Sequence, residues 1–116
     1  MTRQAIANQG EIRIDRIDAL PDGLTTRQPD HEGGYIISHS EQGHHHVLDG
    51  SVDVLERTGG VPAGMQMFYA IVKEYSKLRQ DAAVPHKTVD LDPGIYEFRI
   101  KREFDAFAEQ VRRVAD

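Results

Sequence analysis

Residues 95–104 read IYEFRIKREF and form the clearest strand pattern in the chain. Tyr96, Phe98 and Ile100 alternate with charged neighbours, and apolar residues at every second position are typical of a half-buried β-strand. The preceding DPG at 92–94 predicts a tight turn, because proline presets φ for the first central position of such turns. This stretch therefore predicts a sheet with one face towards an apolar core.

Similar patterns on the N-terminal side predict that most of the chain is β. Residues 11–17 (EIRIDRI) alternate in the same way. Residues 65–78 fit both helical and strand spacing, and we favour a strand because β-branched and aromatic residues are frequent there. We expect one mainly β domain over residues 11–116, a small sandwich or barrel, preceded by a flexible N-terminus at residues 1–10. Asp105 suits the N-cap of a short C-terminal helix.

Composition and charge narrow the class of protein. The 116 residues fit one domain, and the formal net charge of −5 opposes nonspecific binding to nucleic acid and to anionic membranes. The chain has no cysteine, which excludes disulfides and thiolate metal ligands. No apolar run approaches the ~20 residues of a membrane span, and the first residues lack the apolar core of a signal peptide. We expect a cytoplasmic protein that binds a protein partner or forms a homo-oligomer, and that binds neither nucleic acid nor membrane.

Four of the six histidines lie in one segment, residues 35–53, with the sequence YIISHSEQGHHHVLDGSVD. The SEQG at 40–43 predicts a four-residue hairpin loop, and the Asp-Gly at 49–50 predicts a second turn, since Asp-Gly suits the positive φ angles of a type I′ turn. With both turns in place, alternation along the strands brings four candidate ligands to one face and points His45 away. These four side chains are His39, His44, His46 and Asp53.

Three imidazoles and a carboxylate on one face predict a divalent-metal site. Neutral imidazole is the commonest protein metal ligand, and such a set suits zinc, iron, manganese or nickel. His86, ahead of the 95–104 strand, is a further candidate ligand from elsewhere in the fold. The expected metal ligands are His39, His44, His46, Asp53 and His86. The pattern indicates no second acid–base group that would define a reaction, so we favour a binding module over an enzyme.

The HHH run resembles the first motif of the cupins, in which an HxH pair precedes a glutamate. His44 and His46 would supply the pair, which implies a metal-binding β-barrel. Glu56 follows later than the glutamate of that motif, and the second cupin motif is matched only by the Pro-Gly at 93–94. His86 precedes this turn, whereas the cupin histidine follows it. The resemblance implies a metal site and leaves its ligand set open.

Most of the chain is similar to a family of small uncharacterised bacterial and phage proteins. The similarity rests on HSEQGHHHVL at 39–48, DPGIYEFRIKREF at 92–104 and RRVAD at 112–116. It implies a β-rich unit with a shared histidine segment. The alternative function is therefore a non-catalytic accessory protein of a phage or mobile element, in which the histidine segment contacts a partner or responds to pH.

Overall fold

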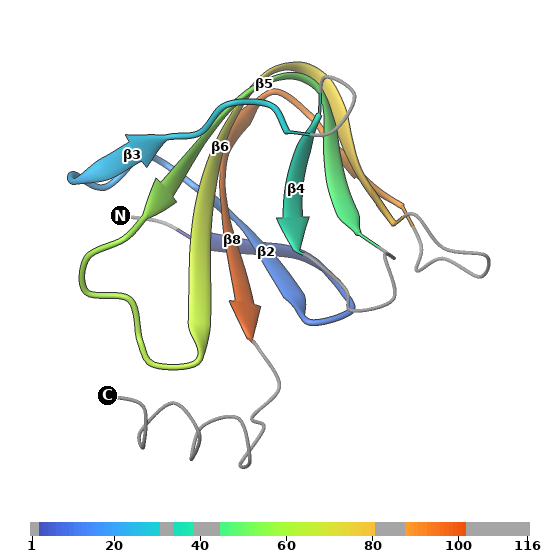
Figure 1. The fold of residues 1–116 in the computed structure, drawn as a ribbon. Helices are drawn as coiled ribbons and strands as arrows, with labels where there is room; N and C mark the ends of the chain where they lie inside the picture. The colour runs from blue at the N-terminus through green and yellow to red at the C-terminus, as the bar shows by residue number, and fades with distance from the viewer. Residues whose placement is uncertain (1–2, 31–33, 39–44, 81–87, 102–116) are drawn as a thin grey trace.

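The computed structural model is a curved antiparallel sheet of eight strands in the described part of the chain (Figure 1). It describes residues 3–30, 34–38, 45–80 and 88–101. The strands are β1 (Arg3–Gln9), β2 (Ile12–Ile17), β3 (Leu24–Thr26), β4 (Tyr35–Ser38), β5 (His46–Arg57), β6 (Met65–Gln80), β7 (Val89–Leu91) and β8 (Gly94–Lys101). This architecture confirms the prediction of a mainly β fold. The helix predicted from Asp105 lies outside the described residues.

The two long strands, β5 and β6, continue the sheet around a bend. The strand order is β1-β2-β8-β6-β5-β3, while β4 pairs with the first part of β5 and β7 with the last part of β6. Figure 1 shows β5 and β6 arching over the rest of the molecule. Their register shifts between Gly50 and Val52, next to the pairing of Gly50 with Ser76. The bend gives the sheet two halves that face each other.

Gly50 permits this bend because a side chain does not fit at its position. Its φ of 120° lies in a region that L residues rarely adopt, and a Cβ there would lie 2.9 Å from the Cβ of Ser76. The turn predicted at residues 49–50 is wrong, because β5 continues through them to Arg57. Pairing with β6 on both sides of Gly50 outweighs the local turn preference of Asp-Gly.

The apolar core lies between the two halves of the bent sheet. Ile14 and Phe98 from β2 and β8 cluster with Leu48 and Leu78 from β5 and β6, and all four are fully buried. Burial of each such side chain stabilises the fold by about 1.5–3 kcal/mol relative to exposure. The other buried members are Ile12, Ile37, Val52, Val54, Phe68, Ala70, Val72, Leu91, Tyr96 and Ile100. The alternation in IYEFRIKREF therefore predicted the inward face of β8 correctly.

The N-terminal segment is part of the sheet, which differs from the flexible N-terminus predicted for residues 1–10. β1 pairs antiparallel with β2 along its length. The register shifts between Ala5 and Ala7, so Ile6 is the extra residue of a β-bulge. RQAIANQ lacks a regular apolar alternation, so the pairing with β2, not its own pattern, makes this segment a strand.

Two other strand predictions are confirmed. Residues 11–17 contain β2, and residues 65–78 lie within β6. The ambiguous spacing of the second segment is resolved by its neighbours, because β5, β7 and β8 all form hydrogen-bonded ladders with β6. In the described ranges no helix is long and apolar enough to cross a membrane.

Candidate functional site

His46 begins β5, and its side chain is buried. It lies opposite Ser38 of β4 on one side and opposite Gln80 of β6 on the other. Only 2% of its surface is exposed. The predicted hairpin register would pair His46 with Ile37. In the structure the register shifts between Ile36 and Ser38, so His46 is paired with Ser38 instead.

A chain of hydrogen bonds determines which nitrogen of the His46 ring carries a proton. The Gln9 amide donates from Nε2 to the Leu78 carbonyl oxygen at 2.9 Å, and that oxygen can only accept. Gln9 Oε1 therefore faces His46, 2.7 Å from Nδ1. Because an amide oxygen also only accepts, the assigned proton is on Nδ1. In the neutral ring the lone pair is then on Nε2.

The Nε2 side of the ring faces a carboxylate from the β1–β2 turn. Glu11 Oε2 lies 3.7 Å from His46 Nε2. The other Glu11 oxygen accepts a short hydrogen bond from Ser38 Oγ, and Gln80 Nε2 lies 3.4 Å from His46 Nε2. These contacts bring the β1–β2 turn against the end of β4, as Figure 1 also shows, and against the adjoining ends of β5 and β6.

The pairing of His46 with Glu11 has two chemical uses. A protonated His46 ring forms an ion pair with the carboxylate. A neutral ring presents the Nε2 lone pair beside a carboxylate oxygen, and both atoms can then bind one cation. In a tetrahedral site with ligands ~2.1 Å from the ion, two ligand atoms lie about 3.4 Å apart, close to the observed 3.7 Å.

The structure does not bring Asp53 to His46. Asp53 is seven positions further along the continuous strand β5, and residues an odd number apart point to opposite faces. Its carboxylate forms an ion pair with Lys73 Nζ at 3.1 Å, and both side chains are about half exposed. The prediction that Asp53 joins the histidines required a turn at residues 49–50, which β5 does not make.

The predicted ligands His39, His44 and His86 lie outside the described residues. Over the ranges that are described, no group of three or more His, Asp or Glu side chains is placed to hold a metal ion. His46 and Glu11 therefore form a two-residue arrangement to which other segments would have to add ligands.

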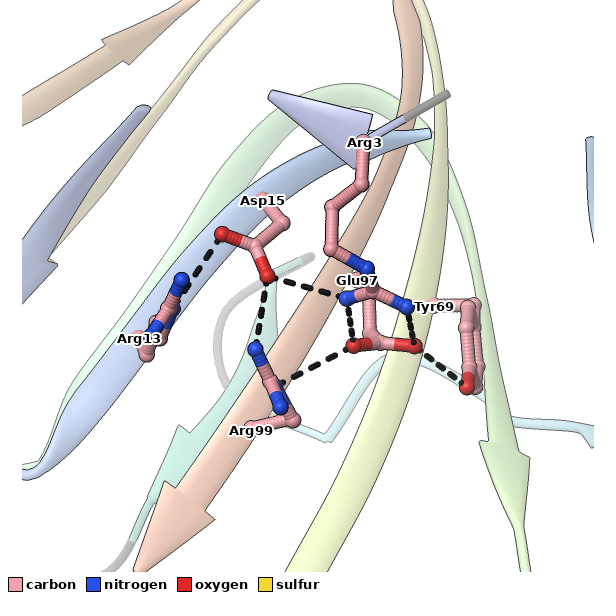
Figure 2. Close-up of polar contacts among 6 residues, drawn as sticks. All are labelled: Arg3, Arg13, Asp15, Tyr69, Glu97 and Arg99. Carbon is pink, nitrogen blue, oxygen red and sulfur yellow. Dashed lines mark hydrogen bonds and ion pairs between the residues drawn. The ribbon is translucent and has the colours of Figure 1, made fainter. Parts of the chain in front are cut away.

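A second polar cluster lies on the outer face of the sheet (Figure 2). Asp15 on β2 and Glu97 on β8 are directly opposite each other, although both are acidic. Arg3 lies between them, 2.9 Å from Asp15 and hydrogen-bonded to both oxygens of Glu97. Arg99 also joins them, with Nη2 2.8 Å from Asp15 and Nε 3.2 Å from Glu97. We call these four residues, which form a closed ring of alternating charge, the ion ring.

Two further residues bond to the ion ring. Arg13 Nε lies 3.3 Å from one oxygen of Asp15, and the Tyr69 hydroxyl donates to Glu97 at 2.8 Å. The Asp15 side chain is fully buried and that of Glu97 is 4% exposed. Arginine side chains, themselves partly exposed, cover the carboxylates, and all four carboxylate oxygens have a donor.

The donors keep both carboxyl groups of the ion ring ionised. Burial raises the pKa of Asp15, but hydrogen bonds from its three arginines outweigh burial and hold that pKa below its ordinary value. Burial likewise raises the pKa of Glu97, while hydrogen bonds from Arg3 and Tyr69 lower it further than burial raises it. With every oxygen engaged, these carboxylates join the strands and are not placed to act as general bases.

The sequence patterns predicted neither Glu11 beside His46 nor the ion ring. The sequence did contain a signal for the ion ring. Asp15 and Glu97 are charged residues at positions that alternate with the inward-facing positions of their strands. Only the register between β2 and β8 shows that these two acids are opposite each other. The sequence contained no comparable signal that Glu11 lies beside His46. This contact forms because the β1–β2 turn reaches the far half of the sheet.

The bent sheet and the pairing of the buried His46 with the exposed Glu11 define a small β protein with a polar site at one end of its sheet. Residues 8–101 match the model of a family described as a domain of unknown function (DUF8820), and the chain belongs to that family. No curated protein and no solved structure matches the chain. This match confirms the prediction that the chain belongs to an uncharacterised family. The matched range includes His46 and Glu11 and begins after Arg3.

Proposed function

We propose that the protein is a divalent-metal-binding β module whose site is built around His46. The observation that supports this most directly is the pair of contacts on the two sides of the His46 ring. Gln9 Oε1 accepts the proton assigned to Nδ1, so in the neutral ring the Nε2 lone pair is on the side of the Glu11 carboxylate. In metal sites a ligating histidine almost always donates its second ring N–H to a carbonyl, carboxylate or water, which orients the ring. The Gln9 amide has that role here.

The proposed ligand set combines His46 and Glu11 with His39 and His44. His39 directly follows Ser38, and His44 comes two residues before His46. Because Ser38 and His46 are paired, the segment that contains both histidines starts and ends beside the proposed site. His86 remains a further candidate, in the segment after Gln80, the other neighbour of His46.

The chemistry of this donor set favours zinc, iron, manganese or nickel. Imidazole and carboxylate ligands suit all four ions, and the chain has no cysteine thiolate. Glu11 replaces Asp53 as the carboxylate in this proposal, because Asp53 lies on the opposite face of β5. A bound ion with an open position would polarise a bound oxygen or activate water, so the same site is compatible with binding or with catalysis.

The test is elemental analysis of untagged protein that has been purified without chelator or nickel resin. We expect about one equivalent of a divalent transition metal per chain. His46→Ala and His39→Ala should each lose it, while His45→Ala, at the position directly before β5, should retain it. Far-UV circular dichroism of each variant separates loss of metal from loss of fold.

Glu11→Gln is a more conservative substitution at the same proposed site. It keeps the size of the side chain and an oxygen that can accept from Ser38, and it removes the charge next to His46. We expect weaker metal binding with an unchanged fold. A folded, metal-free protein that ignores added zinc, iron, manganese and nickel would contradict the proposal. It would favour the alternative, an interaction protein of a phage or mobile element whose histidine segment contacts a partner.

A further inference from the structure

Positively charged side chains gather at one place on the outer face of the sheet. Arg13 on β2 is directly opposite Arg99 on β8, and Lys101 is two positions further along β8, on the same face. Arg57 of β5 lies in the same row across the sheet, since Met67 of β6 is opposite both Arg99 and Arg57. We call Arg13, Arg57, Arg99 and Lys101 the basic patch.

The cations at this place outnumber the carboxylates. Asp15 and Glu97 are the acidic residues at the outward positions of β2 and β8, and three arginines already surround them (Figure 2). Arg13 reaches Asp15 through Nε, and within the described part of the chain its two Nη atoms make no hydrogen bond. Lys101 is exposed and forms no ion pair with any residue that the structure describes. Several N–H donors of the basic patch therefore face solvent.

This surplus of positive charge contrasts with the rest of the molecule. The chain has more acidic than basic residues, 19 against 14. At the bend of the sheet Lys73 has its own partner, Asp53. Like charges that are directly opposite on neighbouring strands are destabilising, and Asp15 offsets this repulsion between Arg13 and Arg99 only in part. A further anion bound from outside would offset the remainder.

Apolar side chains border the basic patch. Met65 is directly opposite Lys101, as Met67 is opposite Arg99. Met67 is buried and Met65 partly buried in one apolar cluster on the outer face. The unbranched methionine side chain adapts to different partners, and arginine and methionine are both enriched at protein interfaces. The surface therefore offers charge and apolar contact side by side.

We propose that the basic patch binds an acidic segment of a partner protein, whose carboxylates pair with Arg13, Arg99 and Lys101. A guanidinium group can pair with a carboxylate through two parallel hydrogen bonds, and the Nη atoms of Arg13 are available for this. Alternate side chains of an extended segment are ~6.6 Å apart, the same spacing as Arg99 and Lys101 along β8. An apolar side chain of the segment packs on Met65. A long nucleic acid suits this surface less well, because its charge extends beyond the patch to an otherwise acidic protein.

Fluorescence anisotropy with a synthetic peptide tests the proposal. The probe is a dye-labelled nine-residue peptide with glutamate at its odd positions, except for a central leucine, and serine between them. We expect saturable binding to the full chain that weakens as salt is raised, because the charges are exposed. Arg13→Gln and Lys101→Gln should each weaken binding about 5-fold, as for an exposed ion pair. Circular dichroism verifies that both variants are folded.

Arg16→Gln is the matched control. Arg16 lies on the same strand as Arg13, three positions away and so on the other face, where its guanidinium donates to the Pro93 carbonyl oxygen. The substitution changes the net charge by the same amount as Arg13→Gln does. It should leave the affinity for the peptide unchanged.

The outcomes separate the proposal from its competitors. Binding of the peptide that is weakened by Arg13→Gln and Lys101→Gln, and not by Arg16→Gln, supports it. A folded parent protein that does not bind the peptide overturns it. Equal weakening by Arg13→Gln and Arg16→Gln also overturns it, because the peptide then responds only to overall charge. A single-stranded DNA of the same charge that binds more tightly than the peptide, and is released by the same variants, would replace it with a nucleic-acid interface.

Discussion

Arg3 and Gln9 lie on the same strand, six positions apart, yet their side chains occupy opposite faces of the sheet. Arg3 is paired with Ile17, which clusters with Met67 and Tyr69 on the outer face, and Gln9 is paired with Ile12 of the apolar core. Residues an even number apart normally share a face, and the bulge in β1 reverses this by adding one residue. A single strand therefore connects the ion ring on the outer face to His46 on the inner one.

Arg3 should stabilise the protein more than Arg13. Arg3 bonds to both Asp15 and Glu97, whereas Arg13, among the residues that the structure describes, forms an ion pair with Asp15 alone and is 55% exposed. Arg3→Ala leaves two opposed, buried carboxylates short of a donor, and we expect a loss of about 1–3 kcal/mol in the free energy of unfolding. Arg13→Ala should lose about 0–1 kcal/mol, as for exposed pairs. Urea unfolding followed by circular dichroism compares them, and equal losses would contradict the bridging role of Arg3.

The ion ring should make the protein sensitive to acid. In the folded protein the pKa values of Asp15 and Glu97 lie below their ordinary values of 3.8 and 4.5. A carboxyl group with a lowered folded pKa adds stability above its unfolded pKa, and this stability is lost as the pH falls through the folded pKa. We therefore expect the free energy of unfolding to decrease as the pH is lowered from about 5.

Glu97→Gln separates this effect from general acid denaturation. The variant removes one of the two carboxyl groups with lowered pKa, so its stability at neutral pH should be lower and its dependence on acid shallower. Asp53→Asn is the control, since the Asp53–Lys73 pair is about half exposed. Urea unfolding at a series of pH values measures both. The explanation fails if Glu97→Gln loses stability with acid as steeply as the parent does.

A side chain at Gly50 should destabilise the bend of the sheet more than one at Gly23. Both glycines have positive φ, but a Cβ at Gly23 meets nothing within 4 Å, while a Cβ at Gly50 lies 2.9 Å from the Cβ of Ser76. Gly23→Ala should cost about 1 kcal/mol for the backbone alone, and Gly50→Ala about 2–4 kcal/mol because crowding is added. Thermal and urea unfolding give the two values. Similar losses would mean that β5 and β6 can separate at the bend without penalty.

Gln9 should act as a positioning residue for His46. Gln9→Leu removes the acceptor of the Nδ1 proton, so the ring is no longer held in one tautomer, which ¹⁵N chemical shifts of the imidazole report directly. If the proposed metal site is correct, zinc affinity should also fall by about 10–100-fold, the usual effect of losing such a partner. Asn8→Ala, at the adjacent exposed amide, should change neither. An unchanged tautomer in Gln9→Leu would show that Gln9 does not orient the ring.

The sequence by itself determined the class of fold and the inward faces of its clearest strands. Apolar residues at every second position in EIRIDRI and IYEFRIKREF place Ile12, Ile14, Tyr96, Phe98 and Ile100 in the core, as the structure confirms. This information is local, because alternation along one strand specifies which side chains must leave water, whichever strand lies beside it.

Only the tertiary structure decided which strands pair and in what register. Glu11 reaches His46, Asp15 meets Glu97, and Gly50 lies inside a long strand because of contacts between residues far apart in the chain. Such contacts depend on the register of the whole sheet, where one extra residue moves every later side chain to the other face. Local preferences, such as the turn tendency of Asp-Gly, are smaller than the combined pairing on both sides of them.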